Sequence, residues 1–171
     1  MLTTEIAVYS AIAAALFFDF VNGFHDSANS IATVVGTRVL RPLYAVIIAA
    51  IANFAGPFIF GTAVAATVGK GIIQPSFSTV DVIFAGLIGA IIWDLITWYF
   101  GLPSSSSHAL IGGLIGSALL AGGTSALVFS GIEKTLTFIV VSPTLGFASA
   151  FGIALIVMYF FRNHTSSHVN K

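Results

Sequence analysis

Polar side chains recur at helical spacing along residues 19–38, "DFVNGFHDSANSIATVVGTR". Alternating steps of three and four residues would place five of them on one stripe of a helix: Asp19, Asn22, Asp26, Asn29 and Thr33. Two carboxylates and two amides exceed what simple bonding between helices needs, so we expect the stripe to line a binding cavity. The alternative is that these groups only satisfy one another. Asp26 and Asn29 are the strongest candidates, whereas Asp19 can also be solvated near a helix end.

Gly23 and His25 lie inside this segment, and each leads to a separate prediction. Gly23, together with the small residues that follow it, predicts a break in the helix near residues 22–25. Histidine as a residue type is suited to proton coupling at physiological pH, so His25 is a candidate for that role. A single histidine beside a glycine can equally well hydrogen-bond a backbone carbonyl, so both roles stay open.

A block of four serines and a histidine, "GLPSSSSHAL", follows an apolar run at residues 101–110. Pro103 ends one helix and serines cap the next, so a helix is predicted to begin near residues 105–108. Its backbone N–H groups and the serine hydroxyls would form an anion site that suits a tetrahedral oxyanion such as phosphate. The alternative is an ordinary capped turn that is rich in serine.

Three further polar residues rank lower. Asn53 is typical of a hydrogen bond between helices. Asp94 is flanked by Trp93 and Trp98, which are typical of the membrane interface, so we expect it near that interface. His108 would be the base of an intramembrane serine hydrolase, but it directly follows the serines and no Gly-x-Ser-x-Gly turn is present. The sequence therefore favours a protein that is not an enzyme.

The elements that must position these residues are membrane helices. Only 7% of the 171 residues are charged and 57% are hydrophobic, which places the chain in a bilayer. Five stretches suit crossing or re-entrant helices: 6–22, part of 42–69, 80–100, 109–121 and 135–161, the last with a kink at Pro143. We expect residues 1–171 to form one all-α, polytopic membrane domain whose first stretch is a retained helix. The zero net charge and the absence of cysteine argue against nucleic-acid partners and a thiolate metal site.

The basic residues of the short loops indicate an orientation. Arg38 and Arg41 follow the first stretch, and Arg162 and Lys171 follow the fifth. Placing both groups in the cytoplasm puts the N-terminus outside, although two other lysines then fall on the outer side. An odd number of crossings means that a second copy fused in tandem would be inverted, as in inverted-repeat transporters.

The two polar segments together, "NGFHDSANSIATVVGTRVL" and "GLPSSSSHALIGGLIGS", resemble the PiT family of inorganic phosphate transporters. The hallmark Gly-Ala-Asn-Asp-x-Ala-Asn is matched at Gly23, Asp26, Ala28 and Asn29. A proline- and serine-rich block ending in histidine is matched by residues 103–108. The similarity extends through most of the chain. It implies cation-coupled phosphate import by alternating access, built on two inverted repeats, in the cytoplasmic membrane of a bacterium or archaeon.

The resemblance also assigns roles to residues. The residues implied to bind phosphate are Asp26, Asn29, Ser105, Ser106 and Ser107. The residues implied to bind the coupling ion are Asp26, Asn29, His25 and Asn22. Secondary candidates are Asp19, Thr33, His108 and Asn53. Phe24 and His25 stand where the hallmark has Ala and Asn. This variant resembles the bacterial low-affinity branch, which is proton-coupled and carries phosphate with a divalent metal. Either H⁺ or Na⁺ is thus expected as coupling ion, with no covalently bound cofactor and no metal site in the protein.

Family members carry a second Asp-Asn motif and a second serine block, and neither occurs after residue 122. The chain corresponds to the N-terminal half, as a fragment, one product of a split gene, or a half that forms an antiparallel homodimer. Two other functions stay open: a permease for sulfate or a related oxyanion, and a channel subunit with a passive polar pore.

Overall fold

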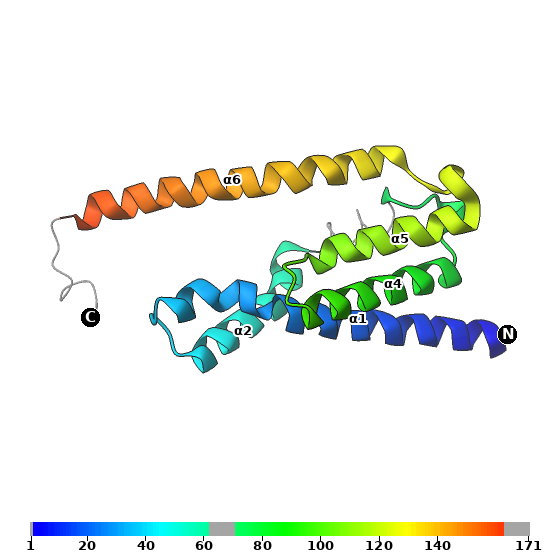
Figure 1. Cartoon of the computed structure of the whole chain (residues 1–171), viewed down its shortest axis with the longest axis horizontal. Coiled ribbons are helices and arrows are strands. Elements are labelled where there is room, and N and C mark those ends of the chain that lie inside the picture. The colour runs from blue at the N-terminus through cyan, green and yellow to red at the C-terminus, as the bar shows by residue number, and fades with distance from the viewer. Residues whose placement is uncertain (1, 62–70, 163–171) are drawn as a thin grey trace. The chain divides into compact units, whose positions relative to one another are not determined.

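The computed structural model describes residues 2–61 and 71–162, which form an all-α protein (Figure 1). Its elements are α1 (Leu2–Gly36), α2 (Pro42–Phe60), the 3-10 turn η1 (Pro75–Phe77), α4 (Val80–Tyr99), α5 (Ser106–Gly122), the 3-10 turn η2 (Gly123–Ala126) and α6 (Phe129–Phe161). An isolated β-bridge joins Ile73 to Leu127. The chain forms two compact units, Met1–Phe129 and Ser130–Lys171, and the second contains nearly all of α6.

All five of these α-helices are long and apolar enough to cross a membrane. Their large apolar side chains point outward: on α2, Phe54 and Phe58 are 75% and 80% exposed. Such a surface fits lipid and not water. The expected polytopic all-α fold is confirmed, while the end of the second stretch and Lys171 lie outside the described residues.

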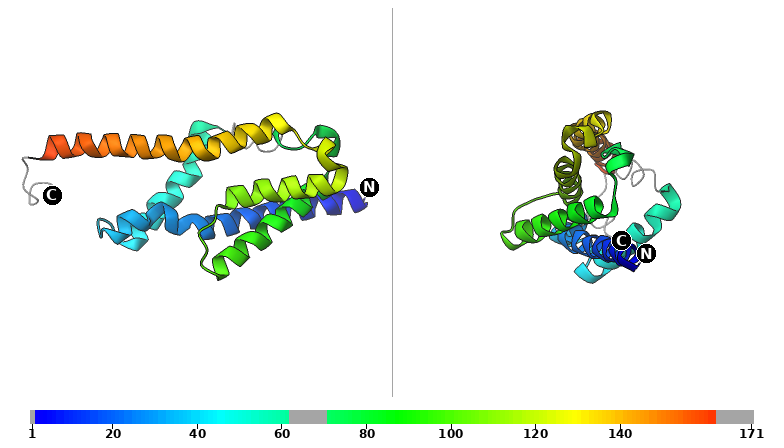
Figure 2. Two further views of the ribbon diagram at one scale, coloured as in Figure 1. Left: turned by 45° about the horizontal axis from the view of Figure 1, so that its top comes forward. Right: turned by 90° about the vertical axis from the view of Figure 1, so that its right-hand side faces the viewer.

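Helices α1, α4 and α5 pack side by side in the first unit (Figure 2). Their shared core combines small and branched apolar side chains: Ala14 and Phe18 of α1 with Leu87, Ala90 and Ile91 of α4. Ala109 and Leu110 of α5 pack against this cluster. The core therefore fixes the polar part of α1 relative to the start of α5.

Two glycines let α4 and α5 approach closely. A Cβ at Gly113 would clash with the carbonyl oxygen of Gly86, and a Cβ at Gly86 would lie 3.1 Å from Leu114 Cα. Small residues are used in this way between membrane helices, because backbone contact increases the packed area.

The predicted helix break near residues 22–25 is wrong. Helix α1 is continuous from Leu2 to Gly36, through Gly23. One glycine lowers helix stability by only about 1 kcal/mol, and the long helical runs on both sides outweigh that cost. The polar stripe is consequently held on one unbroken helix. Helix α6 likewise continues through Pro143, so this proline does not end the element.

Candidate functional site

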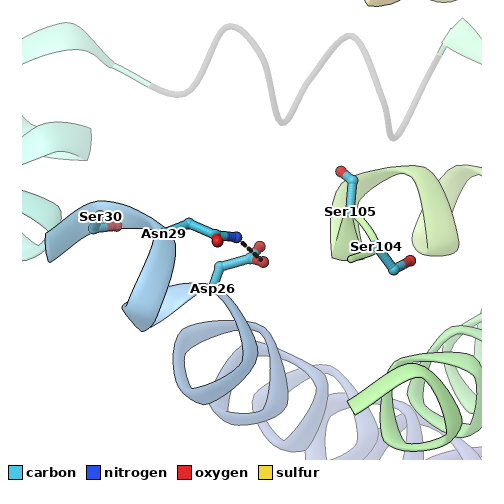
Figure 3. Close-up of a pocket in the computed structure, with 5 residues that line it drawn as sticks. All are labelled: Asp26, Asn29, Ser30, Ser104 and Ser105. Atoms are coloured by element: carbon cyan, nitrogen blue, oxygen red, sulfur yellow. Dashed lines mark hydrogen bonds between the residues drawn. The ribbon is translucent and has the colours of Figure 1, made fainter. Parts of the chain in front are cut away.

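A cavity of about 380 Å³ lies between the polar stripe of α1 and the start of α5. Its lining residues are Asp26, Asn29 and Ser30 of α1, and Ser104 and Ser105 before α5. In Figure 3, Asp26 and Asn29 extend from α1 toward the serines on the other side. The structure thus brings together the two segments that the sequence singled out, which lie about eighty residues apart.

Both carboxylate oxygens of Asp26 have partners. Oδ2 accepts a hydrogen bond of 2.6 Å from the Ser106 hydroxyl. Oδ1 accepts one of 3.4 Å from Asn29 Nδ2 and lies 3.2 Å from His25 Nδ1. Because three side chains contact it, the carboxylate is held in one orientation at the edge of the cavity.

Ser106 is the buried link between the two helices. Its side chain is fully buried, and its hydroxyl also contacts Asn22 Oδ1. A hydroxyl has one hydrogen, so it donates to either Asn22 or Asp26 at any moment. The role of Ser106 in holding phosphate stays a prediction, and the structure shows its hydroxyl in contact with Asn22 and Asp26.

His25 bridges α1 to α4. Its Nε2 lies 3.3 Å from the Thr97 hydroxyl, which itself lies 3.0 Å from the carbonyl of Trp93 and 3.1 Å from that of Asp94. The hydroxyl hydrogen is directed to a carbonyl, so Thr97 Oγ1 accepts from Nε2–H. Nδ1 then faces Asp26, and a proton must lie on one of those two groups for the contact to be attractive.

The start of α5 supplies hydrogen-bond donors. Ser105 is the N-cap, and its side chain accepts from the His108 backbone N–H at 3.4 Å. Its own O–H remains able to donate, as do the remaining N–H groups of the first turn. The predicted start of this helix is confirmed, and its N-terminal dipole favours an anion beside Ser105.

Other predicted site residues lie elsewhere. Ser107 is exposed and does not line the cavity, and Asp19, Thr33 and Asn53 are exposed on their helices away from it. His108 lines a second cavity of about 420 Å³ between α4 and α5, with Ser104, Ser105 and several glycines. Within the described residues, no hydrogen bond joins the His108 ring to a serine hydroxyl.

The sequence reasoning did not anticipate the positions of four residues in this region. Ser30 and Ser104 line the cavity, and each is adjacent in sequence to a predicted residue. Thr97 contacts His25 and gave no signal of its own. No sequence signal indicated that the side chain of Asp94, on α4, is fully buried.

The chain is similar to several known proteins. Residues 22–171 match the model of the phosphate transporter family. The chain is 57% identical over 160 residues to a probable low-affinity inorganic phosphate transporter of Rhizobium meliloti (strain 1021), covering 94% of this chain and 48% of that protein. It is 46% identical over 161 residues to the protein of the same description from Bacillus subtilis (strain 168), covering 92% and 47%.

A solved structure titled "The sodium-dependent phosphate transporter" has a TM-score of 0.80 to this chain at 31% identity, covering 91% of this chain and 40% of that one. The chain spans about half the length of the curated relatives. Its five apolar helices indicate a multi-pass membrane protein. Because the family match takes in most of its residues, the chain belongs to the phosphate transporter family.

Proposed function

We propose that this chain forms the phosphate-binding half of a cation-coupled symporter in a bacterial cell membrane. The observation that carries the proposal is the cavity in which Asp26 and Asn29 face Ser104, Ser105 and the N-terminus of α5. Hydroxyl, amide and backbone N–H groups donate to the anion from both sides. The relatives named as inorganic phosphate transporters support the same substrate.

The Asp26 carboxylate favours phosphate over sulfate. A carboxylate repels an anion unless the anion donates a hydrogen to it, and phosphate carries an O–H at neutral pH whereas sulfate does not. With Oδ2 and Oδ1 already held by Ser106 and Asn29, the carboxylate is fixed as an acceptor for that O–H. Sulfate would lose this hydrogen bond and meet a charge of its own sign.

The contacts of His25 support coupling to a cation. A proton shared between His25 and Asp26 reduces the negative charge beside the anion, and release of that proton restores it. Phosphate and proton would therefore bind together and leave together, which is the requirement for symport. A sodium ion at Asp26 would have the same electrostatic effect, so the ion is to be identified by experiment.

The test is binding of radiolabelled phosphate to the purified, reconstituted chain. We expect saturable binding that unlabelled phosphate displaces and sulfate does not. Asp26→Asn should weaken it about tenfold or more, equivalent to about 1.4 kcal/mol. Asp81→Asn, an exposed carboxylate at the start of α4, is the matched control and should bind normally.

Unchanged binding in Asp26→Asn, or equal displacement by sulfate, would contradict the proposal. Uptake under an imposed proton or sodium gradient, into vesicles that contain this chain fused to a second, inverted copy, identifies the coupling ion. Accumulation against the phosphate gradient excludes a passive pore.

A further inference from the structure

Asp94 is a buried carboxyl group that the phosphate site does not use. Its side chain is fully buried in the second half of α4, the helix that packs against both α1 and α5. Neither carboxylate oxygen has a hydrogen-bond partner among the described residues. A buried polar group with no partner is rare in native proteins and requires a physical explanation.

The surroundings decide the form in which this carboxyl is stable. An ionised carboxylate that is buried without donors is strongly destabilising, and in the membrane interior water does not replace them. A sodium ion would need several further oxygen ligands around it. A proton needs none, because it converts the group into a neutral acid.

The charged groups that act on Asp94 connect it to the phosphate site. On α1, the titratable groups that act on Asp94 are His25 and Asp26. On α4 the other carboxylate is Asp81, which is exposed in the first turn, and on α5 the titratable group is His108, which is also exposed. Thr97, one helical turn after Asp94, contacts the His25 ring.

We propose that Asp94 is a proton-binding site whose occupancy is coupled to phosphate binding at Asp26. When Asp94 is protonated, the carboxylate charge that the described residues place beside the anion is that of Asp26. When it loses the proton, a second negative charge develops near the same cavity and disfavours the anion. The coupling is reciprocal, so bound phosphate holds the proton on Asp94.

The proton site itself is tested without transport. Infrared spectroscopy of the reconstituted chain should show the carbonyl band of a protonated carboxylic acid at neutral pH, with the frequency shift in D₂O that identifies an acid. The band should disappear in Asp94→Asn and remain in Asp81→Asn. Asp94→Glu should retain an acid band at a shifted frequency, which separates loss of the carboxyl from misfolding.

Two results would overturn the proton site. One is an unchanged spectrum in folded Asp94→Asn, which would mean that Asp94 is ionised. The other is a band that sodium chloride removes and choline chloride does not, which would assign the site to sodium.

The coupling rests on the proposed function and has a separate readout. Inorganic phosphate should raise the pH at which half of the Asp94 band is lost, and Asp94→Asn should flatten the pH dependence of phosphate binding. A band that phosphate does not move, in a chain that binds phosphate, would overturn the coupling. If the chain showed the Asp94 acid band but did not bind phosphate, the proposed function would be contradicted and the proton site at Asp94 would still be supported.

Discussion

Among single residues, Ser106 matters most for the geometry of the site, because its hydroxyl holds the Asp26 carboxylate. It lies between Asn22 of the polar stripe and Asp26, and it is fully buried. Ser106→Ala removes the buried donor, so Asp26 Oδ2 loses its hydrogen bond and Asn22 Oδ1 loses its contact with the hydroxyl. We expect a loss of stability of about 1–3 kcal/mol and weaker phosphate binding, because Asp26 is no longer held.

Ser107→Ala is the matched control, since the neighbouring hydroxyl is exposed and lies outside the cavity. It should change neither thermal denaturation in detergent nor phosphate binding. The prediction would be contradicted if Ser107→Ala weakened binding more than Ser106→Ala, because Ser107 would then be the serine that contacts the anion.

At this scale the sequence indicated residue types but not their directions. A run of four serines is compatible with any of them facing the site, and only the packing of α5 on α1 decides that Ser105 lines the cavity while Ser106 is buried. The burial of Asp94 was not predictable for a similar reason. It depends on the packing of α4 against α1 and α5, which local sequence does not report.

At the scale of elements, the contact of α4 with α5 is the closest helix pair in the first unit. Gly113→Ala would place a methyl group against the Gly86 carbonyl, which is backbone and cannot rotate away. We expect the helices to separate and the stability to fall by about 1–3 kcal/mol. The loss of stability is measured by thermal unfolding, followed through the fluorescence of Trp93 and Trp98, which both lie on α4.

Gly112→Ala provides the control on the same helix, because a Cβ there has open space around it. It should be neutral or stabilising, since alanine is the better helix former. If both variants were destabilised equally, helix propensity and not the contact with α4 would determine the loss of stability.

Helix positions were largely predictable, because long apolar runs and caps are local signals. The third stretch was predicted at 80–100 and α4 spans Val80–Tyr99. The fourth begins at Ser106 and not at 109, since its serines form the cap and the first turn. The break at Gly23 was not found, because an intrinsic preference of one residue is weaker than the cooperativity of a long helix.

At the scale of the whole molecule, the chain spans about half the length of the relatives that it matches. The chain covers 48% and 47% of two relatives and 40% of a related solved structure. Helix α6 has no buried residue, and α2 exposes most of its apolar side chains. We infer that a second, inverted half is required for alternating access, so the chain alone should bind phosphate without accumulating it.

A direct tandem fusion of two copies tests this inference, because five crossings invert the second copy automatically. With a short polar linker we expect gradient-driven phosphate uptake that Asp26→Asn in both copies abolishes. Adding one transmembrane helix to the linker makes the copies parallel and should eliminate uptake while leaving phosphate binding intact.

The chain contains no cysteine, so a single Thr37→Cys in either copy reports the orientation of that copy through its labelling by an impermeant maleimide. Uptake by the parallel fusion, with both cysteines labelled from the same side, would contradict the inverted arrangement.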